Sequence, residues 1–330
     1  MECNANAIVG TQLKTGERTM NQCLMPQPIH ASGIAILRAA GLEPVLGEDA
    51  YAAADPERVV AGIFRSTPFT RTDMERFRHL RVIGVHGVGF DNIDLVAARE
   101  RGITVFNIPG RNARSVAEHV VGLMFALNKQ LLASDQAARA GNMGFRFHAD
   151  LRELHGQTLG LIGFGAIGRA TGMLAVALGM QVKVFARSAT EQQLNALGMR
   201  RAESLQALLG GSDIVSLHLP ALPETNQLIG REQLGWMKPT AFLINTGRAP
   251  LIDEAALIEA LQAEVIAGAG LDVYAYDQMP ADYPLLHLPN VVLTPHTGGS
   301  TQQSLVRMAT DVTLGVLDAL AGGEPENRLV

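Results

Sequence analysis

The sequence predicts an α/β protein whose strands form doubly wound, parallel sheets. Short apolar runs, typical of buried strands, alternate with helical patterns along almost the whole chain. One of these runs leads through a glycine-rich turn at residues 163–168 into a helical segment. The chain has 330 residues, which is too long for one ordinary hydrophobic core, so we expect two domains.

The first part of the chain predicts a small α/β unit that ends near Pro109. Residues 1–19 are polar without a clear period, and we interpret them as a flexible extension. Helices are expected at Ser32–Ala40, Pro56–Val60, Thr72–Phe77 and Leu95–Arg101. Strands are expected at Gln22–Met25, Glu43–Val45, Gly62–Phe64, Val82–Val85 and Thr104–Phe106.

The second part predicts a larger sheet. Ser115 to Gly141 has the pattern of one long helix, and Thr301 to Leu320 is expected to form the last helix. Six strands are expected between them, which suits a complete doubly wound fold. They are Leu159–Ile162, Val182–Phe185, Ile214–Leu217, Ala241–Asn245, Ala267–Leu271 and Val291–Leu293.

The glycine-rich turn indicates a dinucleotide site. It is Gly163-Phe164-Gly165-Ala166-Ile167-Gly168, between an apolar strand and a helix, which is the context that gives G-x-G-x-x-G its meaning. The first glycine allows a tight turn, the second lets backbone approach a pyrophosphate, and the third lets helix and strand pack closely. The alternative is a glycine-tolerant loop in another kind of parallel sheet.

The next strand, Gln181 to Phe185, is followed by Arg187 and Ser188. An NAD site usually has an acidic residue at this point, to bind the ribose 2′-hydroxyl, and none is present here. A guanidinium group can instead bind a 2′-phosphate, so the sequence favours NADP over NAD. The alternative is an arginine that stacks on the adenine without any preference for phosphate.

Composition limits the class of protein. The chain is 47% hydrophobic and 18% charged with a net charge of -5, which indicates a globular protein without a nucleic-acid footprint. Two cysteines are too few for a disulfide framework, and no segment resembles a signal peptide or a membrane span. The nine histidines show no metal-ligand spacing. We therefore expect a cytoplasmic protein with neither a metal nor a membrane partner.

Several motifs together resemble the D-isomer-specific 2-hydroxyacid dehydrogenase family. They are HGVGFDNIDL (86–95), GRNARSVAEH (110–119), LGLIGFGAIG (159–168), HLPALPET (218–225), INTGRAPLID (244–253), GLDVYAYDQMP (270–280) and LPNVVLTPHTGGST (288–301). The resemblance implies a Rossmann-type NAD(P)-binding domain, residues 111–297, inserted into a smaller flavodoxin-like substrate domain, residues 20–110 and 298–330. It also implies an active site in the cleft between the domains, and a homodimer.

The resemblance gives three residues catalytic roles. Arg248 would bind the carboxylate and carbonyl oxygens of the substrate, and His296 would be the general acid-base, a role for which its ordinary pKa is suitable. Asp277 stands where the family usually has a glutamate that pairs with this histidine, and Asp282 or a water could share that task. Each has a plainer alternative: an ion pair of Arg248 with Asp253, a polar loop histidine, and a turn residue before Pro280.

The resemblance extends to further binding residues. Cofactor contacts are expected from the glycine turn and from Pro220, Thr225, Thr246, Gly247, Arg248, Asp272, His296, Gly298 and Gly299. Asp272 would receive the nicotinamide carboxamide. Substrate contacts are expected from Gly87, Val88, Gly89 and Arg248, and from Arg65 unless that residue is only a surface arginine.

The resulting hypothesis is an NAD(P)-dependent 2-ketoacid reductase that acts on glyoxylate, hydroxypyruvate or a similar small acid. A phosphoglycerate dehydrogenase is the alternative within the same class. A dinucleotide-sensing binding protein, similar to the corepressor branch of the family, is the alternative from another class.

Overall fold

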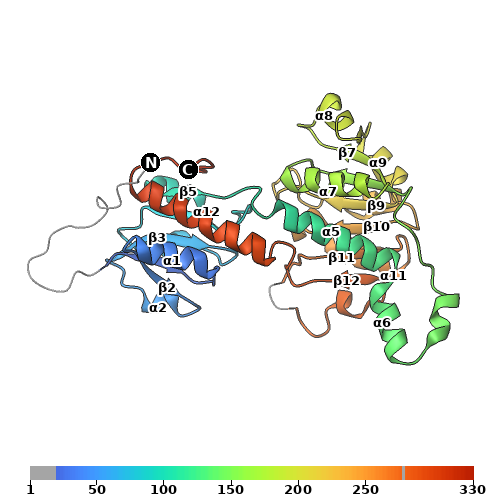
Figure 1. Cartoon of the computed structure of the whole chain (residues 1–330), viewed down its shortest axis with the longest axis horizontal. Coiled ribbons are helices and arrows are strands. Elements are labelled where there is room, and N and C mark those ends of the chain that lie inside the picture. Colours follow the sequence, from blue (N-terminus) through green and yellow to red (C-terminus); the bar gives the residue numbers. More distant parts are fainter. Residues whose placement is uncertain (1–19, 277–278) are drawn as a thin grey trace, which may run out of the picture. The chain divides into compact units, whose positions relative to one another are not determined.

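The computed structural model describes residues 20–276 and 279–330 (Figure 1). Residues 1–19 and Asp277 therefore lie outside the described residues. The chain divides into two compact units, and we describe each by itself. Unit 1 contains Met1–Asn112 and Thr301–Val330, and unit 2 contains Ala113–Ser300. The expected α/β class is confirmed, because both units are built on parallel sheets.

Unit 1 has a five-stranded sheet in the order β2-β1-β3-β4-β5, which is the flavodoxin-like order. The strands are β1 (Gln22–Met25), β2 (Glu43–Leu46), β3 (Val59–Phe64), β4 (Val82–Val85) and β5 (Thr104–Phe106). The helices are α1 (Ala31–Ala39), α2 (Ala50–Ala53), α3 (Arg71–Arg76), α4 (Leu95–Glu100) and α12 (Gln302–Leu320).

Helices cover both faces of this sheet because its strand residues alternate between two apolar cores. Ile63 of β3 packs in one core with residues of α1 and α12, and the next residue, Phe64, packs in the other core with residues of α3 and α4. Both side chains are fully buried. The helices α1 and α12, which are far apart in sequence, lie side by side on one face (Figure 1).

The prediction of a helix at Pro56–Val60 is wrong. The chain makes a turn there, in which Arg58 N donates to Asp55 O at 2.9 Å and Glu57 N donates to the Asp55 carboxylate at 3.0 Å. The strand β3 then starts at Val59, which is fully buried. The apolar residues after the turn belong to the sheet, and the helix of this region is α2, before Pro56.

Unit 2 has a seven-stranded sheet in the order β12-β11-β10-β9-β6-β7-β8. The strands are β6 (Thr158–Ile162), β7 (Gln181–Phe185), β8 (Arg200–Arg201), β9 (Ile214–Leu217), β10 (Phe242–Asn245), β11 (Gly268–Leu271) and β12 (Val291–Leu293). The chain runs outward from β6 to β8 and then returns to β9, so the order reverses between β6 and β9. Doubly wound sheets bind ligands at this reversal point.

Two expectations for unit 2 differ from the structure. Six strands were expected, and β8 is a seventh, whose two exposed residues carry no apolar pattern. The long helix expected over Ser115 to Gly141 is two helices, α5 (Ala113–Asn128) and α6 (Leu131–Arg139), separated at Gln130, which has a φ of 45°. Arg152 N donates to Asn128 O at 2.8 Å, so the last carbonyl of α5 is satisfied by a distant segment and not by continued helix.

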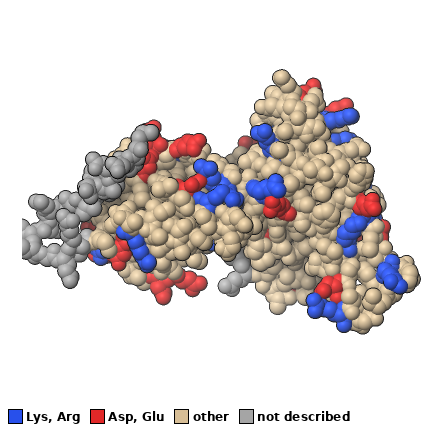
Figure 2. Space-filling view, viewed as in Figure 1, with Lys and Arg blue, Asp and Glu red and all other residues tan. Residues whose placement is uncertain are grey.

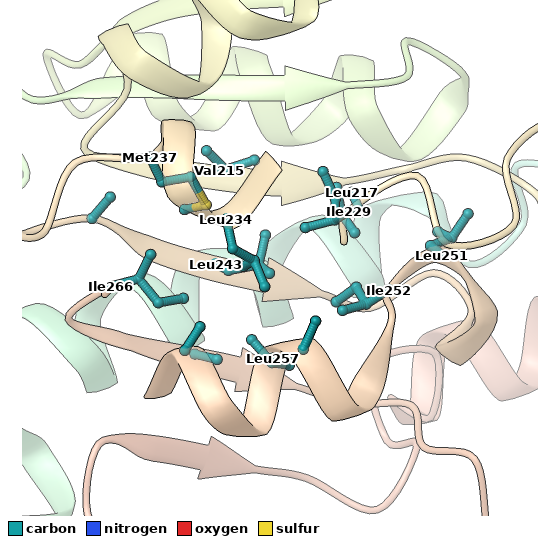
Figure 3. Close-up of a cluster of buried hydrophobic side chains, with 14 of the residues drawn as sticks. Val215, Leu217, Ile229, Leu234, Met237, Leu243, Leu251, Ile252, Leu257 and Ile266 are labelled. Atoms are coloured by element: carbon teal, nitrogen blue, oxygen red, sulfur yellow. The ribbon is translucent and has the colours of Figure 1, made fainter. Parts of the chain in front are cut away.

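The helices of unit 2 enclose two apolar cores on the two faces of its sheet. One core joins β9 and β10 to α10 (Arg231–Trp236) and α11 (Glu254–Gln262), with Val215, Leu234 and Leu257 among its members (Figure 3). The other joins the sheet to α5 and to α7 (Ala166–Ala177). The remaining elements are α8 (Glu191–Asn195), α9 (Leu205–Gly211), η2 (Met143–Phe147), η3 (Ala249–Leu251) and η4 (Pro284–His287).

The viewed surface carries charges of both signs next to each other (Figure 2). Ion pairs one helical turn apart include Arg114 with Glu118 and Arg139 with Asp135. A membrane-crossing helix, with the length and apolarity that this needs, is not found among the residues described.

Candidate cofactor and catalytic site

The ends of six strands in unit 2 lie in one row, and this row places most of the expected site residues. Phe185 pairs with Ile162, Ile162 with Leu217, and so on across the sheet through Asn245, Leu271 and Leu293. The next residue of each strand therefore leaves the sheet at the same edge. These residues are Ala186, Gly163, His218, Thr246, Asp272 and Thr294.

The glycine turn at the end of β6 has the shape that its three glycines predict. Gly163 has a φ of +99°, and a Cβ there would lie 2.4 Å from the carbonyl oxygen of His218. A Cβ on Gly168 would lie 2.5 Å from Gly163 O. A Cβ on Gly165 would meet nothing within 4 Å. The first and third glycines are thus required by the protein itself, whereas the space beside Gly165 is open to a ligand.

The helix that follows the turn starts without a side-chain cap. Gly165 is the N-cap of α7, so the first N–H groups of the helix, at Ala166, Ile167 and Gly168, have no helical acceptor and no cap side chain among the residues that the structure describes. Such a terminus favours a phosphate group. The turn and the helix start therefore fit the pyrophosphate of a dinucleotide.

At the end of β7, Arg187 and Ser188 are both exposed. Ser188 lines a cavity of about 400 Å³. Phe164 and Arg169 line it from the glycine turn and α7, and Gln193 lines it from α8. Arg187 follows the strand directly beside the glycine turn, since β6 and β7 are neighbours. On the other side of the turn, Thr225 closes the loop after β9, where its hydroxyl donates to Pro220 O at 2.7 Å.

Asn245 shapes the loop that carries Thr246, Gly247 and Arg248. Its buried side chain accepts from Gly247 N at 3.0 Å and donates to Arg248 O at 2.9 Å. The half-buried Arg248 donates from Nη1 to Gly247 O at 2.9 Å. The hydroxyl of Thr246 is buried and has no hydrogen-bond partner among the described residues, so its polar group is available to a ligand.

Asp272 organises the loop that carries His296. Its carboxylate accepts from Thr294 Oγ1 at 2.6 Å, Thr297 N at 2.8 Å and Gly298 N at 2.9 Å. Burial raises the pKa of this nearly inaccessible carboxyl group, but the hydrogen bonds outweigh that effect and hold the pKa below its ordinary value. Among the described residues, Oδ2 accepts only from Gly298 N, which leaves a lone pair for a further donor.

His296 is exposed and has a φ of 53°, in the left-handed region. It is preceded by Pro295, and its N–H donates to Thr294 O at 2.9 Å. Two of the three residues that donate to Asp272 on this loop, Thr294 and Thr297, stand on either side of the Pro295-His296 pair. The backbone of His296 is therefore fixed from both sides by one buried carboxylate. Asp277, its expected partner, lies outside the described residues.

The expected substrate residues of unit 1 lie at the carboxyl ends of β3 and β4. Arg65 follows β3 and donates to Pro28 O at 3.2 Å, and Gly87 to Gly89 follow β4, where a Cβ on Gly87 would meet nothing within 4 Å. Between them, His86 is buried, and neither ring nitrogen has a partner among the described residues. Burial, followed by the nearby positive charge of Arg65, lowers the pKa of His86 to about 4.

Sequence reasoning missed several residues that hold the site together. His119 of α5 approaches Thr294 Oγ1 at 2.9 Å and Asp272 Oδ1 at 3.5 Å. The other missed residues are Asn245 and Tyr274, whose hydroxyl donates to Leu271 O and Thr294 O, both at 2.8 Å. His119 and Asn245 lie inside matched motifs, and this was the available signal for them. The contact of His119 with Thr294, 175 residues away, has no local sequence pattern.

The comparisons with known proteins agree with this geometry. The profile of the D-isomer-specific 2-hydroxyacid dehydrogenase, NAD-binding domain, matches residues 121–298. The chain belongs to this family. A glyoxylate reductase of Korarchaeum cryptofilum is 38% identical over 251 residues, which are 75% of each chain. A D-3-phosphoglycerate dehydrogenase of Methanocaldococcus jannaschii is 35% identical over 311 residues, 93% of this chain and 59% of that protein.

A dehydrogenase of known structure shares the fold over nearly its whole length. The NADPH-dependent glyoxylate/hydroxypyruvate reductase of Sinorhizobium meliloti, solved with NADP and malonate, has a TM-score of 0.81 and 27% identity. The match covers 94% of this chain and 97% of that one. The recognition of the family from its motifs is thus confirmed, and so is the Rossmann-type sheet.

Proposed function

We propose that this dehydrogenase reduces a small 2-keto acid, such as glyoxylate or hydroxypyruvate, to the D-2-hydroxy acid. The proposal rests mainly on the row of strand ends, which supports a common role for the glycine turn, Arg248 and His296. In this proposal the turn binds the cofactor pyrophosphate, and the Thr246 hydroxyl and Asp272 Oδ2 bind its nicotinamide end. Pro220, Thr225, Gly247, Gly298 and Gly299 line the rest of the cofactor site.

The proposed chemistry divides between the cofactor and two side chains. The bound, reduced nicotinamide supplies a hydride to the keto carbon. The guanidinium of Arg248 holds the carboxylate and the ketone oxygen of the substrate and polarises the ketone. Protonated His296 gives its proton to that oxygen, which becomes the hydroxyl of the product, and Asp277 favours the protonated form. Arg65 and the backbone of Gly87, Val88 and Gly89 are further proposed substrate contacts.

NADP is proposed as the preferred cofactor over NAD. Arg187 and Ser188 stand where an NAD site has its acidic residue, and the Sinorhizobium meliloti reductase holds NADP. The test follows the loss of reduced-cofactor absorbance with NADPH and with NADH. Glyoxylate, hydroxypyruvate, pyruvate and acetone serve as substrates, so the assay tests both the proposed substrate class and the proposed cofactor preference. Turnover of the acids with little turnover of acetone supports the proposal. Equal turnover of acetone would refute the role of Arg248.

A phosphoglycerate dehydrogenase activity is the second candidate, because of the identity to the Methanocaldococcus jannaschii enzyme. The chain spans 59% of that protein, and the absence of an acidic residue after β7 argues for the reductase. Adding 3-phosphoglycerate with NAD and phosphohydroxypyruvate with NADH to the same assay distinguishes the two. A strong preference for the phosphorylated pair would favour the second candidate.

The proposal includes a cytoplasmic homodimer. Support comes from α6, from η2 and from the segment after them, which expose large apolar side chains, with Phe147 72% exposed. Neither α6 nor η2 buries a residue. An exposed apolar surface of this kind is typical of an interface between subunits. The other exposed large apolar side chains of these segments are Leu131, Leu132, Met143 and Leu151.

A further inference from the structure

We propose that Arg201 is a positioning residue for the 2′-phosphate of the cofactor. In this inference Arg201 holds the loop after β7 so that Arg187 and Ser188, together with Arg169 of α7, form one phosphate pocket. The inference rests on the proposed preference for NADP, and it assigns that preference to residues beyond Arg187 and Ser188.

The guanidinium of Arg201 fixes both ends of a four-residue loop. One terminal nitrogen donates to Ala189 O, and the other donates to Ala186 O at 3.1 Å. The residues between these two carbonyl groups are Arg187 and Ser188. A planar fork can bind both carbonyls at once, whereas an ammonium group on a flexible stem has no such fixed geometry. Arg201 therefore determines the backbone position from which the two phosphate-binding candidates extend.

The far side of the loop is also fixed. Ala189 is buried in the apolar core, and the next residue, Thr190, caps α8. Thr190 Oγ1 accepts from Gln193 N at 3.2 Å, and Gln193 Oε1 accepts from Thr190 N at 3.1 Å. With both ends held, Arg187 and Ser188 are the loop residues that extend into solvent.

The loop borders a cavity of about 400 Å³ that suits a phosphate. Ser188, Gln193 and Arg169 supply its polar lining, and Phe164, Ala196 and Leu197 supply apolar walls. In the part of the chain that the structure describes, Arg169 and Arg187 have no carboxylate partner. Arg169 lines the cavity, and Arg187 is the chain neighbour of the lining residue Ser188. Two exposed arginines without counter-charges at these positions favour a dianion, since guanidinium groups bind phosphate oxygens in pairs.

The chain supplies a matched control for Arg201. Arg200 is its neighbour in β8, carries the same charge and is likewise exposed. Adjacent residues of a strand point to opposite faces, and the Arg200 side chain makes no hydrogen bond or ion pair among the described residues. Arg200→Ala therefore removes the same charge from the same strand without removing a contact to the loop.

The test measures binding by calorimetry, so that it does not depend on activity. The probes are adenosine 2′,5′-bisphosphate and AMP, which differ by the 2′-phosphate. We expect Arg201→Ala to weaken the bisphosphate at least about tenfold and AMP by less than about twofold. Arg201→Lys should recover part of the loss, and Arg200→Ala should change neither Kd by more than about twofold. Arg169→Ala should resemble Arg201→Ala.

Three results would overturn the inference. Equal losses of bisphosphate affinity in Arg201→Ala and Arg200→Ala would mean that the positive charge matters and the contact of Arg201 with the loop does not. Equal losses for both probes would mean that the whole cofactor site is disturbed. A wild-type protein that prefers the bisphosphate, with an Arg201→Ala variant that keeps this preference, would refute the inference alone. Conversely, a normal probe pattern without any 2-keto acid turnover would refute the proposed function and leave the phosphate pocket intact.

Discussion

Asp272 offers a sharp test of how the loop of His296 is held. Asp272→Ala removes one acceptor from three donors at once. Gly298 N is buried, and a buried donor without a partner costs about 1–3 kcal/mol. Thr297 is exposed and the Thr294 hydroxyl can rotate, so each of their lost bonds costs about 1 kcal/mol. The total loss in the free energy of unfolding should be about 3–5 kcal/mol.

Denaturant unfolding and steady-state kinetics together check this value. Asp253→Ala is the control, since Asp253 also lies in unit 2 but makes a single cap bond, to Ala256 N at 3.2 Å, and should cost about 1 kcal/mol. Asp272→Asn keeps one carbonyl oxygen and should lie between the two. In Asp272→Ala, kcat should also fall, because His296 loses its fixed backbone. An unfolding free energy within about 1 kcal/mol of wild type, or unchanged kcat, would refute the reasoning.

The pH dependence gives a second check on Asp272. Its folded-state pKa is lowered, so the carboxylate contributes stability that is present above the unfolded pKa and is lost as pH falls through the folded pKa. The wild-type protein should therefore lose stability in acid more steeply than Asp272→Asn, in titrations of the unfolding free energy below about pH 4. Parallel curves for the two proteins would show that the carboxylate makes no such contribution.

Four further predictions concern other residues. Arg248→Ala should lower kcat/KM for 2-keto acids by about 3 kcal/mol of transition-state stabilisation, measured against Arg248→Lys, which should recover only part. Arg187→Ala should lower kcat/KM at least about tenfold for NADPH and by less than about twofold for NADH. The pKa of His86 is about 4 in the folded state and near its ordinary value in the unfolded state. The free energy of unfolding of the wild-type protein should therefore fall by up to about 3 kcal/mol as the pH falls from about 6.5 to 4. His86→Leu should abolish this pH dependence. Phe147→Glu should convert a dimer into monomers in light scattering, and a wild-type monomer would refute the interface.

The sequence predicted the parts of the fold that depend on local patterns. The glycine turn is where the motif put it, because Gly163 and Gly168 have no room for a side chain. The break at Gln130 escaped prediction, since no glycine or proline marks it. The end of α5 is bound by the backbone N–H of Arg152, which comes from a distant segment. The two residues of β8 are exposed arginines, whose strand conformation follows from their pairing with β7.

The candidate site shows the same division. Arg248 and His296 were expected from motifs, and the structure brings their loops to one edge of one sheet because the strand ends are in register. Their roles stay predictions. His119 is one of the nine histidines without metal-ligand spacing, and only the folded chain brings it to Asp272. Hydrogen bonds between segments far apart in sequence leave no spacing that could be recognised in one chain.

The left-handed backbone of His296 sets stability against the proposed catalytic role of its side chain. A side chain in that region costs about 1–2 kcal/mol, and glycine avoids the cost. A selection for heat resistance alone would therefore favour His296→Gly, a variant that should melt later and would lack the proposed general acid. Thermostable versions of this protein should be sought on other segments, and a rise in melting temperature from a change at this residue should be treated as a warning of lost catalysis.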